Sequence, residues 1–367
     1  MSKHYYTSES VTVGHPDKIC DTVADSIVDY ALSQDPNSKM AVECTIKDDF
    51  ILIYGECNTK ANIPFEEIAL NTVKEIGYTE EFHVLVKVGQ QSPEINQAVV
   101  KEDEVGAGDQ GIMYGYACDE TPNYMPLSID LAHRLAKQLQ HVRETDPETI
   151  LKPDGKTQVT VEYEGDKITR IDTIVVSTQH CACASLEDVQ KYVMEKVVTP
   201  ICANELVDEN TKYLINPSGS FIVGGSFGDS GTTGRKIVVD TYGGHGRIGG
   251  GCFSSKDPSK VDRSAAYYAR YVAKNVVAHG FAKKCEIQVS YAIGVVKPIS
   301  VYVDTYGTNT VSEEQIQDFV NKNFDFTVTN IIRELDLRRP IYKKLAAYGH
   351  FGRTDLNAPW EAIKDIQ

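Results

Sequence analysis

The stretch GGSFGDSGTTGRKIVVDTYGGHGRIGGGCFSSKDPSKVDR, residues 224–263, is the part of the sequence around which the rest of the chain is organised. Two glycine-rich loops, residues 224–234 and 243–251, flank one apolar run, Ile237–Val239, which we expect to form a strand. Glycine lets backbone N–H groups approach a bulky anion closely. Basic side chains beside such loops supply the counter-charge, here from Arg235, Lys236, Lys256 and Lys260. The stretch therefore predicts a polyphosphate site.

The composition is that of a soluble globular protein. The chain has 367 residues, enough for two or three units, and a formal net charge of −15. We expect neither nucleic acid nor an anionic membrane as a partner of so acidic a chain. The N-terminus has no apolar signal core and no apolar run reaches membrane-spanning length, so we expect a cytoplasmic protein. The nine cysteines include one close pair, Cys181-Ala-Cys183, without zinc-type spacing, and we expect free thiols.

A helix is predicted directly after Pro16, because apolar residues recur at helical spacing from Ile19 onward. Pro16 suits the first helical turn, where a missing N–H costs nothing. His15, Asp17 and Lys18 therefore lie together at a helix N-terminus, where free N–H groups and the helix dipole attract phosphate.

The segment Lys256–Asp262 repeats this arrangement, with Asp257 as the expected N-cap of a second helix and Pro258 in its first turn. One carboxylate from each helix start, Asp17 and Asp262, could hold Mg²⁺, which prefers one or two carboxylates together with phosphate oxygens. Two independently capped helices would explain the proline and the acid of each motif. They would not explain the added lysines and the neighbouring glycine loops.

A pattern of helix, two-stranded hairpin and helix recurs three times along the chain, around residues 43–76, 158–198 and 286–323. It predicts an α+β fold of three similar units, each a mixed or antiparallel sheet with helices over one face. We place the limits of these units at residues 1–101, 102–222 and 223–367. The uncovered sheet faces would need partners, which favours oligomerisation.

Three smaller features complete this interpretation. Residues 89–111 are polar, rich in glycine and without periodicity, which is typical of a mobile lid with hinges at Gly89 and residues 106–108. The run 152–156 is expected to form a turn. Glu43 and Glu56 stand in apolar strands, where a carboxylate is costly unless it is paired or coordinates an ion.

Two known nucleotide-binding patterns match this chain weakly. Gly244–Gly249 fits the pattern G-x-G-x-x-G, but more glycines follow where a helix should begin, and Asp262 falls inside a helix instead of at a strand end. Gly228–Lys236 faintly resembles a Walker loop, yet Arg235 displaces the lysine and Ile237 stands where a magnesium-binding Ser or Thr belongs. The pair of helix starts is the stronger feature.

Seven stretches spread over nearly the whole chain closely resemble the S-adenosylmethionine synthetase family, also called methionine adenosyltransferases. The matching stretches are Gly14–Lys18, Gln91–Pro93, Gly106–Gly111, Gly234–Lys236, Asp240–Gly244, Lys260–Ala266 and Ala347–Gly352. They stand in the order of the family, so the resemblance is highly specific.

The resemblance implies that methionine sulfur attacks C5′ of ATP, forming S-adenosylmethionine and expelling triphosphate, which is then hydrolysed to pyrophosphate and phosphate. It further implies three related α+β domains, two Mg²⁺ and one K⁺ per site, and active sites between the subunits of a homodimer, often paired into a homotetramer. Preorganised cations would neutralise the charge of the leaving triphosphate. The thioether sulfur has no proton to lose, so the site needs clamps more than a general base.

The roles of individual residues carry over from the family by resemblance. His15 aids departure of the triphosphate, and the phosphates are clamped by Lys156, Arg235, Lys236 and Lys256. The residues assigned to catalysis are His15, Lys156, Arg235 and Lys256. The metal ligands are Asp17 and Asp262 for Mg²⁺ and Glu43 for K⁺. Methionine is held by Glu56, Gln91, Asp229 and Lys260. The ATP pocket is bordered by Asp109, Phe221 and Cys252.

Five positions depart from the family pattern. Val13 replaces a usual Glu, Ser220 an Arg, Ile248 a His, Cys252 an Ala and Ser255 a Gly. None of them removes a residue assigned to phosphate, metal or methionine. Two competing classes are a nucleotide sensor without transferase activity and an ATP-dependent kinase. The retained His15, both magnesium carboxylates and the lysines argue against the sensor.

Overall fold

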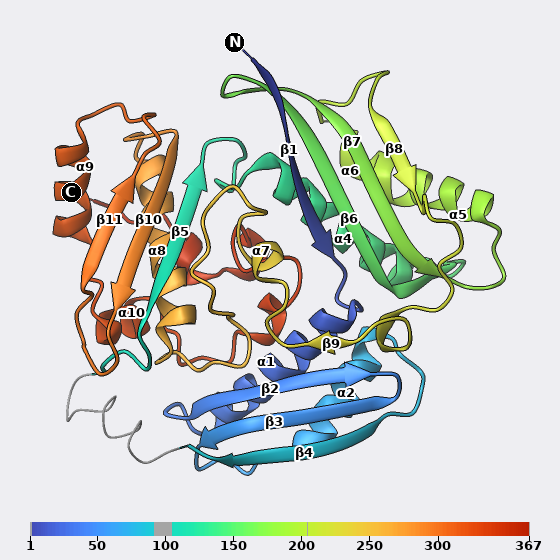
Figure 1. Ribbon diagram of the computed structural model, residues 1–367, viewed down its shortest axis with the longest axis horizontal. Helices are drawn as coiled ribbons and strands as arrows, with labels where there is room; N and C mark the ends of the chain where they lie inside the picture. The colour runs from blue at the N-terminus through green and yellow to red at the C-terminus, as the bar shows by residue number, and fades with distance from the viewer. Residues whose placement is uncertain (1, 92–104, 204, 367) are drawn as a thin grey trace.

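Three sheets are arranged around a central region of loops in the computed structural model, which describes residues 2–91, 105–203 and 205–366 (Figure 1). The first sheet has the order β4 (His83–Gln90), β3 (Phe50–Asn58), β2 (Lys39–Lys47), β9 (Gly231–Thr232). The second has the order β1 (Lys3–Val11), β6 (Leu151–Glu164), β7 (Lys167–His180), β8 (Lys212–Ile215). The third has the order β11 (Ser300–Asp304), β10 (Lys284–Tyr291), β5 (Gly111–Cys118). The pairs β3–β4 and β7–β8 are parallel and the other pairs antiparallel.

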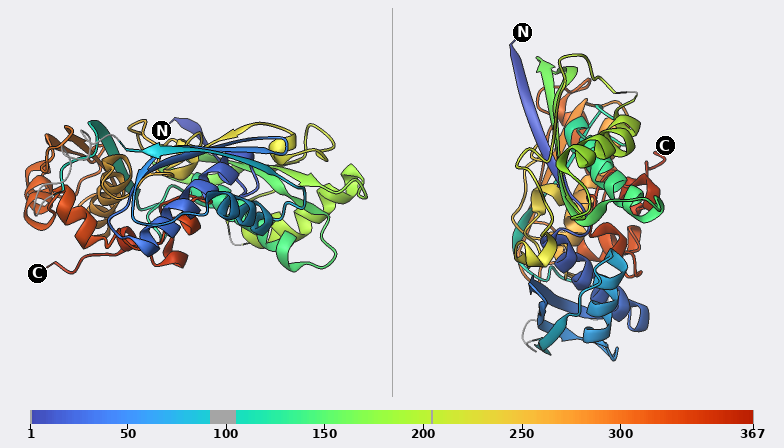
Figure 2. Two further views of the ribbon diagram at one scale, coloured as in Figure 1. Left: turned by 90° about the horizontal axis from the view of Figure 1, so that it is seen from below. Right: turned by 90° about the vertical axis from the view of Figure 1, so that its right-hand side faces the viewer.

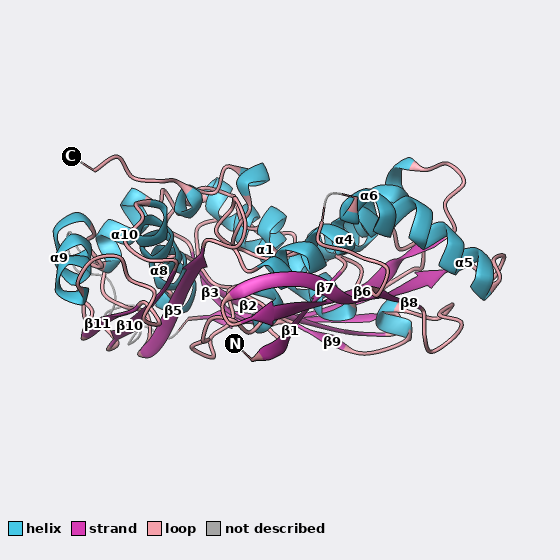
Figure 3. Cartoon of the chain, turned by 90° about the horizontal axis from the view of Figure 1, so that it is seen from above, coloured by secondary structure: helices cyan, strands magenta, loops and turns pink. Residues whose placement is uncertain are grey.

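The long helices lie on one side of the molecule and the strands on the other (Figures 2 and 3). The first sheet is covered by α1 (Pro16–Gln34) and α2 (Phe65–Ile76). The second is covered by α4 (Leu127–Thr145), α5 (Leu186–Val193), a π-helical turn (Met194–Val198) and α6 (Thr199–Cys202). The third is covered by α8 (Val261–Ala278), α9 (Glu313–Asn323) and α10 (Val328–Glu334). The predicted α+β class, with helices over one face of each sheet, is confirmed.

Helix α8 lies at the centre of the hydrophobic core that the first and third sheets share. It is buried along almost its whole length, including its cations Arg263, Arg270 and Lys274. A buried cation needs a carboxylate partner. Arg270 and Lys274 both pair with Glu361 near the C-terminus, at 2.9 and 2.8 Å. The C-terminal segment thereby becomes part of the core.

Each sheet contains one strand that comes from a distant part of the chain. β1 pairs with β6 in the second sheet, β5 pairs with β10 in the third, and β9 pairs with β2 in the first. The predicted sequence limits 1–101, 102–222 and 223–367 therefore do not coincide with the sheets. As limits of independent units they stay a prediction.

The predicted strand at Ile237–Val239 is wrong. Residues Ile237–Asp240 form a single helical turn, α7. The turn directs the Asp240 carboxylate inward, where it pairs with the buried ammonium of Lys18. The apolar run Ile237–Val239 could not indicate this ion pair, because Lys18 lies more than two hundred residues earlier in the chain.

Two further corrections concern the limits of elements. Helix α8 starts at Val261, not at Pro258. Asp257 lies in the turn before it and accepts the N–H groups of Met40 and Ser259, at 2.8 and 2.9 Å. The expected turn at residues 152–156 belongs to strand β6, which is irregular between Leu151 and Gly155.

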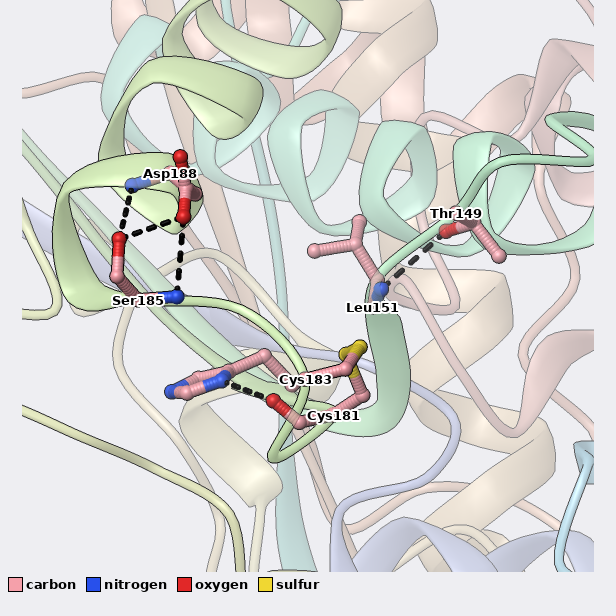
Figure 4. The surroundings of a disulfide bond; sticks show 7 residues. Thr149, Leu151, Cys181, Cys183, Ser185 and Asp188 are labelled. Atoms are coloured by element: carbon pink, nitrogen blue, oxygen red, sulfur yellow. Dashed lines mark hydrogen bonds between the residues drawn. A yellow bond between two sulfur atoms is a disulfide. The ribbon is translucent and has the colours of Figure 1, made fainter.

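Cys181 and Cys183 form a disulfide in the turn that leads from β7 to α5 (Figure 4). The expectation that all cysteines are free is therefore wrong for this pair. The turn brings the two Cα atoms to 5.2 Å, which a disulfide spans readily. The other seven cysteines are free thiols. No helix among the described residues has the length and hydropathy needed to cross a membrane.

Candidate active site

His15 caps helix α1 with its own side chain. Its Nδ1 accepts a hydrogen bond of 3.2 Å from the backbone N–H of Asp17, and Pro16 occupies the first helical position, as predicted. Burial, together with the positive charge of Lys236, lowers the pKa of His15 to about 3, so the imidazole is neutral. Because Nδ1 accepts, the single ring proton lies on Nε2. His15 thus presents a hydrogen-bond donor away from the helix.

Asp17 joins this helix start to the first glycine loop. Its carboxylate accepts from the N–H of Thr232 at 3.0 Å, from Lys236 Nζ at 2.5 Å, and lies 3.5 Å from Arg235 Nε. Burial opposes ionisation, but the hydrogen bonds from Lys236 and from the Thr232 N–H hold the pKa of Asp17 below its ordinary value. A Cβ on Gly231 would lie 2.1 Å from the carbonyl oxygen of Pro16, so only glycine allows this close approach.

A buried charge network supports the same loop from behind. Lys18 Nζ lies 2.9 Å from Asp21 and also pairs with Asp240, and Asp21 accepts the N–H of Gly234 at 2.8 Å. Burial opposes the charge, but the two carboxylates raise the pKa of Lys18. The network therefore fixes the loop directly before Arg235.

The second helix start forms a separate group of contacts. Lys256 Nζ lies 2.5 Å from Asp262 Oδ2, and Lys260 Nζ lies 2.5 Å from Asp257 Oδ2. Burial opposes ionisation of Asp257, but Lys260 and Lys39 lower its pKa to about 2. A Cβ on Gly251 would lie 2.2 Å from Asp262 Cγ, so this glycine loop closes tightly over the carboxylate.

Three assigned side chains stand on strands and face the helix-free side of the molecule. Glu43 alternates with the buried Val42 and Cys44 in β2, and it accepts a hydrogen bond of 3.1 Å from Tyr54. Glu56 in β3 is exposed, so its carboxylate is not desolvated by this chain. Lys156 is exposed in β6, opposite Val11 and Ser177. Burial and the Glu43 charge raise the pKa of Tyr54 to about 12.

The remaining assigned residues lie at loop ends. Gln91 donates its backbone N–H to Cys57, beside Glu56, at 3.3 Å. Asp109 follows Gly108, whose N–H donates to Ser259 at 3.1 Å, so Asp109 lies near the second helix start. Asp229 is exposed. Phe221 accepts the backbone N–H of His180 at its carbonyl oxygen and donates its own N–H to Nε2 of the His180 side chain. Most of the predicted lid, residues 92–104, lies outside the described residues.

Sequence reasoning missed two buried carboxylates that follow Asp17 on helix α1, Asp21 and Asp25. Asp17, Asp21 and Asp25 follow one another at four-residue spacing and so lie on one face of α1, and all three are buried. Buried carboxylates in an otherwise apolar helix require cationic partners. This spacing was the available signal, and the partners are Lys236, Lys18 and Arg263.

Two of the departures from the family pattern, Ser255 and Cys252, lie close to these buried carboxylates and to the first glycine loop. Ser255 is buried and has a φ of 80°, a left-handed conformation that favours glycine, and its N–H donates to Asp25 at 3.1 Å. Cys252 lies against Gly234, and burial raises the pKa of its thiol to about 11. The thiol is therefore protonated and unreactive.

The donor chemistry fits the metals that the resemblance implies. The described residues contain no cluster of three or more His, Cys, Asp or Glu side chains that could hold a metal alone. Asp17 and Asp262 each supply one carboxylate, beside cations suited to phosphate. Mg²⁺ is commonly bound in this manner, by one or two carboxylates and phosphate oxygens. Glu43 supplies a carboxylate oxygen suited to a hard cation such as K⁺.

Comparison with known proteins shows which family the chain belongs to. Models of the N-terminal, central and C-terminal domains of S-adenosylmethionine synthetase match residues 3–96, 104–221 and 223–362. The chain belongs to the S-adenosylmethionine synthetase family. It is 51% identical over 381 aligned positions to the S-adenosylmethionine synthase of Clostridium tetani (strain Massachusetts / E88), covering 99% of this chain and 97% of that protein. As a member of the S-adenosylmethionine synthetase family, the chain is a methionine adenosyltransferase.

Proposed function

We propose that this enzyme joins ATP and L-methionine by attack of the methionine sulfur on C5′ of ATP. The whole triphosphate leaves, and the same site hydrolyses it to pyrophosphate and phosphate. The observation that carries the proposal is that His15 Nδ1 accepts the backbone N–H of Asp17, which leaves the ring proton on Nε2, and that the same Asp17 holds Arg235 and Lys236.

His15 donates its Nε2 proton as a hydrogen bond to the oxygen that leaves C5′. A neutral imidazole can do so without first gaining a proton, which suits a group whose pKa is lowered by burial. The donor is preorganised because Nδ1 is held by the backbone N–H of Asp17. Charge that develops on the leaving oxygen therefore meets a fixed dipole.

The cations from two glycine loops clamp the triphosphate. Arg235 and Lys236 come from the first loop, Lys256 follows the second, and Lys156 stands on β6. Lys236 and Lys256 form ion pairs with Asp17 and Asp262. Mg²⁺ held by these two carboxylates would neutralise phosphate oxygens and leave the lysines for the remaining phosphate charge.

Methionine and K⁺ are assigned to the open face of the first sheet and the loops beside it. Glu56 and Gln91 lie at the ends of the neighbouring strands β3 and β4, and they would hold the amino acid together with Asp229 and Lys260. Glu43 would bind K⁺ through its carboxylate, at the position where Tyr54 already orients it.

We further propose a homodimer or a dimer of dimers with active sites between subunits, acting in the cytoplasm. Lys156, Glu43 and Glu56 all face the side that no helix covers. Apolar side chains are exposed on the strands themselves, among them Leu85 at 54% and Tyr302 at 57%. Exposed apolar surface of this kind favours burial against a second copy.

The test is a product analysis. The purified protein is incubated with ATP, methionine, Mg²⁺ and K⁺, and the products are separated by chromatography and mass spectrometry. S-adenosylmethionine with equal amounts of phosphate and pyrophosphate supports the proposal. ADP would indicate a kinase, and binding of ATP without turnover would indicate a nucleotide sensor.

A further inference from the structure

We propose that Cys181 and Cys183 form a thiol–disulfide exchange site whose redox state controls the position of Phe221. The two cysteines directly follow strand β7 and are separated by one residue. The inference rests on the proposed function in one respect only, namely that Phe221 borders the ATP pocket.

The disulfide is accessible to small thiols. Cys183 is exposed and Cys181 is half-buried, whereas most of the free cysteines are buried. Thiol–disulfide exchange requires that a thiolate reach one sulfur of the disulfide. The exposed Cys183 sulfur is the one that an attacking thiolate reaches.

Stabilisation of the fold is a poor explanation of this disulfide. The loop that it closes contains a single intervening residue, Ala182, and the stabilisation gained by restricting the unfolded chain is smallest for such short loops. Strand β7 is already held by β6 and β8 on its two sides. The second sheet therefore does not depend on this bond.

His180 connects the disulfide to Phe221. Its Nδ1 donates to the carbonyl oxygen of Cys181 at 2.8 Å, which leaves Nε2 as an acceptor for the N–H of Phe221 at 3.0 Å. The backbone N–H of His180 also donates to the carbonyl oxygen of Phe221, at 2.9 Å. His180 is buried. The carbonyl group of Cys181 sets its tautomer, and the tautomer allows Nε2 to accept the hydrogen bond from Phe221.

The segment that follows Phe221 is held by residues at the same end of the neighbouring strands β6 and β7. Gln179 donates to the carbonyl oxygen of Ile222 at 3.0 Å, and Asp154 accepts the N–H of Gly225 at 2.8 Å. Asp154 stands two residues before Lys156, which we assign to the phosphates. A shift of the backbone at Cys181 would therefore displace Phe221 through His180, and to a smaller extent the segment near Lys156.

The exchange reaction balances with a cellular thiol such as glutathione as the reductant. Its thiolate attacks the Cys183 sulfur, the bond between the two protein sulfurs breaks, and Cys181 leaves as a thiolate that takes up a proton. A second glutathione thiolate attacks the glutathione sulfur of the mixed disulfide and releases Cys183, which is also protonated. The protein gains two electrons and two protons, and two glutathiones become one glutathione disulfide.

The first test measures redox state and local structure without using activity. The full-length protein is equilibrated in buffers of graded reduced-to-oxidised glutathione, and thiols are trapped by alkylation and located by mass spectrometry. Hydrogen exchange is then followed in the oxidised and reduced forms. We expect Cys181 and Cys183 to change state together, and the amide of Phe221 to exchange about fivefold faster after reduction, as for the loss of one hydrogen bond.

The second test measures kinetics. Reduction is expected to raise the KM for ATP by about fivefold with a smaller effect on kcat, since a displaced Phe221 weakens binding more than the transfer step. The double variant C181S/C183S should behave like the reduced enzyme in every buffer. Cys202→Ala, which removes a buried thiol elsewhere beneath the same sheet, should keep the response to glutathione.

The two hypotheses fail in different ways. If the pair stays reduced in oxidised glutathione, or if Phe221 exchange and KM are equal in both states, the redox inference is wrong. If reduction speeds amide hydrogen exchange throughout β6, β7 and α5, the disulfide stabilises the fold as a whole and the inference is also wrong. Absence of S-adenosylmethionine production would instead reject the proposed function, while the exchange data would still decide the role of the cysteines.

Discussion

Arg263 in α8 holds Asp25 in α1 through two hydrogen bonds, from Nη1 to Oδ1 at 2.9 Å and from Nη2 to Oδ2 at 2.6 Å. Both side chains are fully buried. The pair joins the two helices whose N-terminal ends carry His15, Asp17 and Asp262. The relative position of the two halves of the proposed site therefore depends on an ion pair that touches neither substrate.

Arg263→Met should be strongly destabilising, because it leaves the Asp25 carboxylate buried without its partner. We expect the free energy of unfolding to fall by about 3–5 kcal/mol, measured by urea denaturation. Arg339→Met, which breaks an exposed pair with Asp336, should cost about 0–1 kcal/mol. Equal effects of the two substitutions would contradict the role of the buried pair.

Lys256→Ala should reduce kcat by about a hundredfold or more under saturating substrates, because a preorganised cation is lost from the triphosphate clamp. Cys252→Ala should lose far less rate, since that position carries a protonated thiol. Lys343→Ala serves as the matched lysine control, because its partner Glu75 lies on the exposed surface. Turnover of Lys256→Ala equal to that of the wild type would remove Lys256 from the clamp.

The pH dependence of stability should contain a contribution from His15. Burial and Lys236 lower its pKa from 6.5 to about 3 in the folded state, so the unfolded chain binds more protons between these values. The free energy of unfolding must then fall as the pH falls from 6.5 toward 3.

His15→Gln should flatten this dependence by up to about 1.4 kcal/mol per pH unit, measured by urea denaturation between pH 4 and pH 7. His83→Gln, at a histidine side chain that is 78% exposed, should leave the slope unchanged. A His15→Gln slope identical to that of the wild type would mean that His15 is not held neutral by the fold.

Ser255→Gly should raise the free energy of unfolding by about 1 kcal/mol, because a residue with a Cβ is strained at a φ of 80°. Ser255→Ala keeps the Cβ and should bring no gain, which makes it the matched control. Thermal and urea unfolding of the three proteins measure the difference. A Gly variant less stable than the wild type would show that the serine side chain contributes more than its backbone costs.

The sequence allowed much of the fold to be predicted wherever one segment carries its own signal. The helix after Pro16, the hairpin of β2 and β3, and the glycine at the end of α2 follow from local periodicity, turn residues and capping, and the structure confirms them. The partners of β1, β5 and β9 could not be predicted, because pairing between distant strands leaves no trace in either strand alone.

The same distinction applies to the candidate site. Local motifs and the family resemblance located His15, Asp17 and Lys256 in the sequence, yet they could not show that His15 Nδ1 is used by the backbone. The tautomer follows from a single contact with Asp17. The supporting network of Lys18 and Asp240 was likewise invisible, since it joins positions separated by more than two hundred residues.

The exchange of strands between the three sheets also constrains how the chain is made. Strand β2 lacks its neighbour β9 until residue 232 has been synthesised, and β5 lacks β10 until residue 291. Until then a growing polypeptide presents open edges that could pair with other chains on the same polysome. Contacts between distant segments form more slowly than local ones, so these edges are the last parts of the first and third sheets to be paired. A chaperone that shields unpaired edges during this interval would raise the yield of folded enzyme more than any change in the active site.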